Sequence, residues 1–126
     1  MARALRALAG MVAGAAVLSV SVPAGQAAGA MAVGACAAYG YAFDYRDAGA
    51  ARAAAQGKCV GGGCKVVMTL KRSCAALAID GHRPCGPHAY ASARGLGDAE
   101  NTALQSCYKS GGRDCVIRAF ACDKKG

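Results

Sequence analysis

The chain has 126 residues, a length that fits one domain and excludes a multidomain protein. It carries a formal net charge of +8 and contains eight cysteines but no tryptophan. Basic charge of this size favours anionic partners such as cell-wall polymers, lipid headgroups or nucleic acid, although a solvated basic surface would have the same composition.

Residues 1–30 have the composition of a secretory signal peptide. Arg3 and Arg6 supply a positive start, an uncharged apolar run follows, and small residues end the segment. We expect cleavage after Ala27 or Ala30. The apolar run is shorter than the roughly 20 residues of a spanning helix, which favours a signal peptide over a membrane anchor. No transmembrane segment would then remain in the mature chain.

The number of cysteines indicates the cellular compartment in which the protein functions. A mature chain of residues 31–126 is near the size at which an apolar core alone gives marginal stability, and eight cysteines in such a chain indicate a disulfide scaffold in an oxidising environment. Residues 33–36 loosely fit a lipobox, but lipidation of Cys36 would leave an odd number of cysteines. We therefore expect a single secreted, extracellular disulfide-rich domain.

The first half of the mature chain predicts two strands and a helix. Residues 31–35 form a short strand, and residues 39–45 alternate aromatic with small or polar side chains, as a strand does. One face of that second strand would carry four aromatic side chains, Tyr39, Tyr41, Phe43 and Tyr45. This face is either the main core contribution or an exposed binding face. Core is the default, because nothing else in the chain is as bulky.

A helix is predicted from an Asp47 N-cap to Lys58, ended by a glycine run. Strands at residues 65–70 and 74–79 follow. A polar loop at residues 80–88 leads to a weaker strand.

After that strand, at residues 88–93, a helix capped by Asp98 runs to Tyr108, and residues 115–122 form the last strand. A shift of 48 positions aligns the two halves through four pairs: Arg46 with Arg94, Ala51 with Ala99, Ala55 with Ala103, and Cys59 with Cys107. We therefore predict an α+β fold of two ββαβ repeats, at about residues 36–74 and 75–122. They would share an antiparallel sheet packed by two helices, and one core.

The repeated pattern has the form A-x-x-x-A-x-x-x-C, a glycine turn, C-x-V-V and C-A-A-x-A. It resembles the bacterial family known as domain of unknown function 4189, over roughly residues 31–122. The matching positions are Ala51, Ala55, Cys59, Cys64, Val66, Cys74, Ala75 and Ala76, then Ala99, Ala103, Leu104, Cys107, Cys115, Ile117, Phe120 and Cys122. The resemblance implies a small secreted, actinobacterial-like protein and no catalytic residue. Relative to the six cysteines of the family, Cys36 and Cys85 are additions.

Eight cysteines allow about 105 pairings. We predict the first of the two schemes below from the repeat, and the second is its rival. The first joins Cys59–Cys64, Cys107–Cys115, Cys74–Cys122 and Cys36–Cys85, with Cys74–Cys122 crossing the core between the repeats. The second keeps Cys36–Cys85 and joins Cys64–Cys74 and Cys115–Cys122 within each repeat.

The side chains of His82, Cys85 and His88 are spaced so that they could bind zinc or copper. A turn-rich loop and a disulfide partner for Cys85 argue against such a site. The sequence has no Cys-x-x-Cys, Gly-x-Ser-x-Gly or His-Glu-x-x-His motif. We therefore expect no catalytic residue, metal or cofactor.

The sequence favours a secreted, non-enzymatic binding or interaction module. Its partner would be an unknown protein or an anionic envelope component, with no specific nucleic acid because aromatic stacking residues are few. One alternative is a small secreted hydrolase or metal-dependent enzyme that uses the His82/Cys85/His88 loop. A secreted effector or toxin is another.

Overall fold

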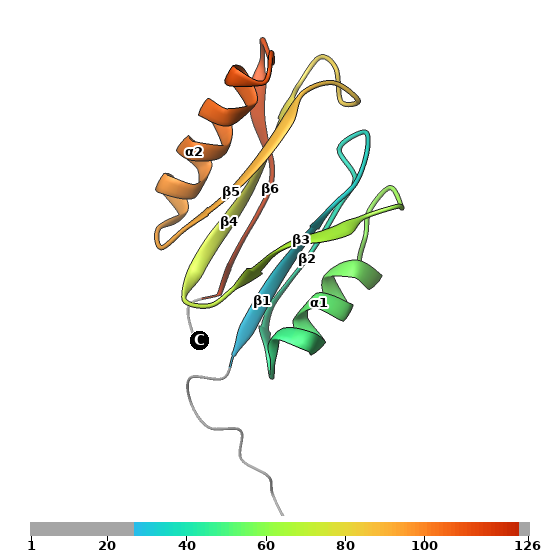
Figure 1. Ribbon diagram of the computed structural model, residues 1–126, viewed down its shortest axis with the longest axis vertical. Coiled ribbons are helices and arrows are strands. Elements are labelled where there is room, and N and C mark those ends of the chain that lie inside the picture. The colour runs from blue at the N-terminus through green and yellow to red at the C-terminus, as the bar shows by residue number, and fades with distance from the viewer. Residues whose placement is uncertain (1–26, 124–126) are drawn as a thin grey trace, which may run out of the picture.

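The computed structural model describes residues 27–123 (Figure 1). Most of the predicted signal peptide, residues 1–26, lies outside the described residues. The first unit consists of β1 (Ala28–Val33), β2 (Tyr39–Tyr45), α1 (Ala48–Gly57) and β3 (Lys65–Leu70). The second consists of β4 (Ser73–Asp80), β5 (His88–Ala93), α2 (Leu96–Lys109) and β6 (Cys115–Asp123). The order strand, strand, helix, strand therefore occurs twice, and the α+β class is confirmed.

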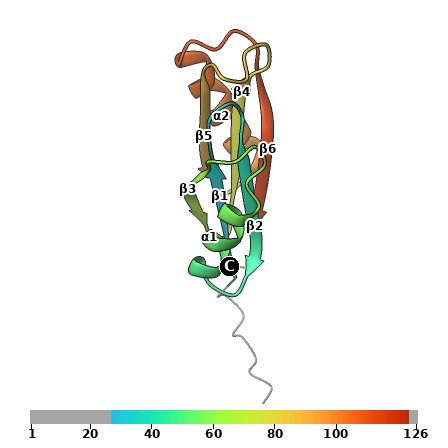
Figure 2. The same ribbon diagram turned by 90° about the vertical axis from the view of Figure 1, so that its right-hand side faces the viewer.

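The strands form two separate sheets, where the sequence predicted a single shared one. Each has three antiparallel strands, in the orders β2-β1-β3 and β5-β4-β6. Figures 1 and 2 show the sheets face to face, with α1 on the outer face of one and α2 on the outer face of the other. β1 and β4 are the central strands, and each pairs on both sides with strands of its own unit, so every ladder of the described residues lies within one unit.

The two units share one core between the sheets. Met31, Leu70 and Leu77 are fully buried there, beside Ala119 and Ala121. In β1 and β4 the side chains alternate, so that larger ones face the other sheet and smaller ones face the helix. Neither sheet could bury its inner face alone, which is the physical reason for the pairing of units.

Alanines set the distance between each helix and its sheet. Ala51 and Ala55 of α1 are fully buried against Ala30 and Ala32 of β1. The backbone approaches closely enough that a Cβ at Gly40 would collide with the Ala55 carbonyl oxygen. Small side chains at these positions are therefore a packing requirement, and larger ones would push the helix away from the sheet.

The ends of two predicted elements need correction. β1 begins at Ala28, three residues before the predicted start. Asp47 caps α1 as predicted, with Oδ1 accepting from the Ala50 N–H at 2.8 Å. By contrast, Asp98 does not cap α2: Gly95 is the N-cap, and Asp98 lies in the first turn, where a carboxylate still interacts favourably with the helix dipole.

Four disulfides staple the fold, in the pairing of the first scheme. Cys59–Cys64 and Cys107–Cys115 each join a helix end to the following strand. The prediction that Cys74–Cys122 crosses the core between the units is wrong. The two residues are neighbours in the β4–β6 ladder of one sheet. The prediction placed Cys74 at the end of the first unit, whereas it lies in the strand that opens the second.

Cys36–Cys85 is the bridge that joins the two units. Cys36 lies in the turn between β1 and β2, and Cys85 lies in the corresponding loop between β4 and β5. Cys36 and the adjacent Ala37 both have positive φ, 55° and 65°. This left-handed backbone is uncommon for residues other than glycine.

We predict that the inter-unit bridge stabilises the protein more than a helix-end bridge does. Its cysteines are 49 residues apart, against 5 for Cys59–Cys64. Loop-closure entropy then gives a loss of about 4 kcal/mol for Cys36→Ser/Cys85→Ser and about 2 kcal/mol for Cys59→Ser/Cys64→Ser. Denaturant unfolding of both double variants measures the difference. Equal losses would contradict the prediction that loop length decides the difference between these two bridges.

Candidate ligand-binding groove

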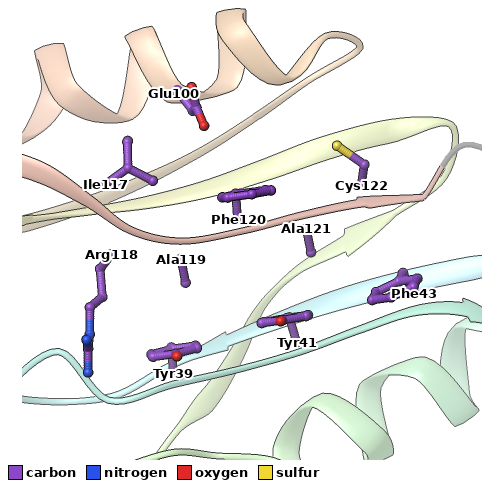
Figure 3. Close-up of a pocket in the computed structure, with 10 residues that line it drawn as sticks. All are labelled: Tyr39, Tyr41, Phe43, Glu100, Ile117, Arg118, Ala119, Phe120, Ala121 and Cys122. Atoms are coloured by element: carbon purple, nitrogen blue, oxygen red, sulfur yellow. The ribbon is translucent and has the colours of Figure 1, made fainter.

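One face of β2 presents a row of three aromatic rings. Successive ring centroids of Tyr39, Tyr41 and Phe43 lie 6.3 Å apart, and neighbouring rings are within 5° and 17° of parallel (Figure 3). The spacing follows from the strand, because alternate side chains share a face. The row is therefore a regular surface along the edge of one sheet.

Tyr45 does not belong to this row, contrary to the sequence prediction. Asp44 has a positive φ of 58°, and the β1–β2 register shifts between Ala28 and Ala30. This irregularity turns Tyr45 to the other face, where it packs beside α1 with the Lys58 Nζ 5.4 Å from its ring centroid. A bulge of this kind changes which face a side chain occupies, and an alternating pattern in the sequence does not reveal it.

Strand β6 forms the opposite wall of a groove of about 580 Å³. Ala119 and Ala121 point from it toward the rings (Figure 3), and these short side chains leave the space open. The guanidinium carbon of Arg118 lies 5.2 Å from the Tyr39 ring centroid, a cation–π contact at one end of the row.

The groove continues around the edge of β6 to its α2 side. Phe120 and Ile117 line that side, together with Glu100 from α2 (Figure 3). Phe120 is 52% exposed, and Phe43 across the groove is 51% exposed. Two large apolar side chains half open to solvent in one hollow are typical of a contact surface.

The aromatic face serves both as core and as surface. Tyr39 and Tyr41 are partly buried and pack against the core between the sheets, whereas Phe43 stands largely outside it. The sequence analysis treated a core role and a surface role for this face as alternatives. The structure combines the two roles in one row of side chains.

Both walls of the groove are edge strands. β2 and β6 each end the strand order of their sheet. The outer edge of β2 is bridged at Tyr39, whose backbone exchanges two hydrogen bonds with Val60. Within residues 27–123 no strand pairs with the outer edge of β6. An edge of this kind presents backbone donors and acceptors to another chain.

The His82/Cys85/His88 loop is not brought together as a metal centre. Cys85 is bonded to Cys36, so its sulfur is not a thiolate ligand. His82 Nε2 lies 2.8 Å from Asp114 Oδ2 at the surface, and His88 pairs with Ile79 at the start of β5. Within the described range, no three His, Cys, Asp or Glu side chains are grouped to hold a metal ion.

The same loop is instead held by a buried carboxylate. Asp80 is 1% exposed and accepts hydrogen bonds from the backbone N–H of His82 (3.0 Å) and Arg113 (3.2 Å) and from the Arg83 guanidinium (3.1 Å). The Arg113 N–H contributes most to lowering the pKa of Asp80. Desolvation opposes this, and the His82 N–H and Arg83 add to the lowering. The sequence analysis placed Asp80 at the start of the polar loop of residues 80–88. No local signal identifies Arg113, 33 residues further along the chain, as its hydrogen-bond partner.

The family model described as "Domain of unknown function (DUF4189)" matches residues 28–122. The chain belongs to this family. A search of curated proteins and a search of solved structures each returned no match. None of the helices in residues 27–123 is long and apolar enough to cross a membrane.

We predict that Asp80 makes the stability of this protein sensitive to acid. Its pKa is lowered in the folded state, so its contribution is complete at neutral pH and is lost as the pH falls below about 4, through the lowered pKa. Asp80→Asn should lower the melting temperature at pH 7 and flatten its dependence on pH between 5 and 2. Asp114→Asn removes an exposed carboxylate and serves as the control. A wild-type pH slope in Asp80→Asn would contradict the prediction.

Proposed function

We propose that this protein is a secreted, non-enzymatic binding module that holds an extended polypeptide segment of a partner protein along the edge of β6. The observation that carries the proposal is the groove between β2 and β6, which has an open strand edge at its centre and half-exposed aromatic rings on both sides. Addition of a strand to a free sheet edge is a common mode of peptide recognition.

The ring spacing supports an extended chain as the ligand. Alternate side chains of a strand are about 6.6–6.8 Å apart, close to the 6.3 Å between successive ring centroids. A segment paired with β6 would direct every second side chain toward Tyr41 and Phe43. The intervening side chains would meet Phe120 on the other side of the strand.

The side chains of the groove suit a protein partner. Aromatic residues and arginine dominate the energetically important positions of protein interfaces, and here Arg118 is held against Tyr39 beside the open edge. Main-chain hydrogen bonds would supply affinity, and the two aromatic hollows would select the side chains of the ligand.

Export from the cell is supported by the disulfides and by the position of β1. Four disulfides suit an oxidising compartment. Of the two predicted cleavage sites, Ala27 leaves β1 whole. Cleavage after Ala30 would remove the first half of a central strand in which Ala28 and Ala30 are buried.

The groove is tested by selecting peptides from a random linear library on the oxidised protein. The double variant Phe43→Ala/Phe120→Ala should bind the selected peptides at least about tenfold more weakly, because it removes the exposed apolar side chain from each hollow. Tyr90→Ala/Tyr108→Ala removes two aromatics of similar exposure elsewhere and should bind as the wild type does.

Three results would contradict the groove proposal. The first is that no peptide is selected, and the second is that the selected peptides bind both double variants equally. The third is that an oligosaccharide panel binds in a manner dependent on Phe43 and Phe120, which would make the groove a glycan site.

Cleavage of the signal peptide is tested by measuring the intact mass of the protein recovered from the culture medium, before and after reduction and alkylation. We predict a mature chain that begins at Ala28 and gains eight alkyl groups only after reduction, since no cysteine among the described residues is free. A chain that begins at Met31, or a lipid mass on Cys36, would contradict this prediction.

A further inference from the structure

A second hollow, of about 560 Å³, lies at the turn between β3 and β4. Its lining consists of Lys71, Arg72, Ser73 and Arg94. Figure 1 shows this turn at the end of the molecule where β6 ends, away from the turn that carries Cys36. Three of the four lining side chains are cationic, and all three of these residues are exposed.

Strand register brings these cations together. Lys71 and Arg72 form the two-residue turn between β3 and β4, with Arg72 at a positive φ of 49°. The β4–β5 ladder pairs Cys74 with Ala93. The residue that follows β5, Arg94, is therefore placed beside Ser73, more than twenty positions away in sequence.

The cations outnumber the acids around the hollow. Asp123 pairs with Ser73 in the β4–β6 ladder and is fully buried, and Asp98 lies in the first turn of α2. With both carboxylates counted, the three cations still leave an excess of positive charge. Lys124 and Lys125 follow directly in the sequence.

Ser73 adds a hydroxyl donor. Its Oγ accepts a hydrogen bond from the backbone N–H of Lys71 at 3.3 Å. That bond fixes the oxygen at the turn and leaves the hydroxyl hydrogen available to an anion. Two guanidinium groups, one ammonium group and one hydroxyl in one hollow match the acceptor oxygens of a tetrahedral oxyanion.

We propose that this hollow binds a phosphate group, with Arg72 and Arg94 as forked donors, Lys71 as a point charge and Ser73 as a hydroxyl donor. The phosphate could belong to a soluble phosphate compound or to a phospholipid headgroup, since both present the same oxygens. This site is separate from the β2–β6 groove, so it does not depend on a peptide ligand.

The experiment uses the oxidised mature protein and two probes. Inorganic pyrophosphate is titrated while backbone amide chemical shifts are followed, and phosphatidylglycerol vesicles are compared with phosphatidylcholine vesicles by flotation. Lys71→Gln/Arg94→Gln removes two charges from the hollow. Lys109→Gln/Arg113→Gln removes two exposed charges from the far end of α2 and is the matched control.

We expect saturable pyrophosphate binding that shifts the amides of residues 71–73 and 94. Affinity should fall at least about tenfold in Lys71→Gln/Arg94→Gln and change less than about twofold in the control. Binding of phosphatidylglycerol vesicles with the same dependence would identify the headgroup as the source. Pyrophosphate binding without vesicle binding would identify a soluble phosphate compound.

Absence of saturable binding to either probe would overturn the proposal. An equal loss in both double variants would also overturn it, because the attraction would then come from overall charge. Melting temperature and disulfide content are compared first. If the double variant is unfolded, Lys71→Gln alone, a change in an exposed turn, is used in its place and should show the same direction of change.

Discussion

Strands β1 and β4 are buried on both faces, and the rest of the structure depends on that constraint. Each must fit a helix on one side and the opposite sheet on the other. The chain meets the first requirement with alanines and the second with larger side chains such as Met31 and Leu77. Because so many core positions are alanine, burial alone contributes modest hydrophobic stabilisation in a domain of this size. The four disulfides offset this by restricting the unfolded chain.

The candidate groove is a consequence of how the two sheets meet. Their middle strands are packed in the core, whereas the edges β2 and β6 face each other with unequal side chains. Large rings on β2 lie opposite Ala119 and Ala121, so the edges touch without filling the space between them. Rings that also support the core are held in place by it, and under the proposed function this order would reduce the entropy lost when a ligand binds.

The loops at one end of the molecule are fixed by a disulfide and by backbone hydrogen bonds to a buried carboxylate. Cys36–Cys85 ties the first hairpin of one unit to that of the other, and Asp80 ties the same loop to Arg113 near the start of β6. These links hold in place a loop rich in histidine, proline and glycine. The opposite end of the domain carries the basic hollow.

The sequence by itself determined the α+β class, the order and approximate ends of the elements, and the family, because helix periodicity, alternation and glycine turns are local signals. Local signals also placed Asp47 as a cap. The separation into two sheets, the confinement of Cys74–Cys122 to one sheet, the turning of Tyr45 to the α1 face and the meeting of Arg94 with Lys71 were decided by the tertiary structure. Each of these depends on strand register or on a bulge. Strand register is set by contacts between segments far apart in the chain. Local sequence patterns therefore do not predict the register or the position of a bulge.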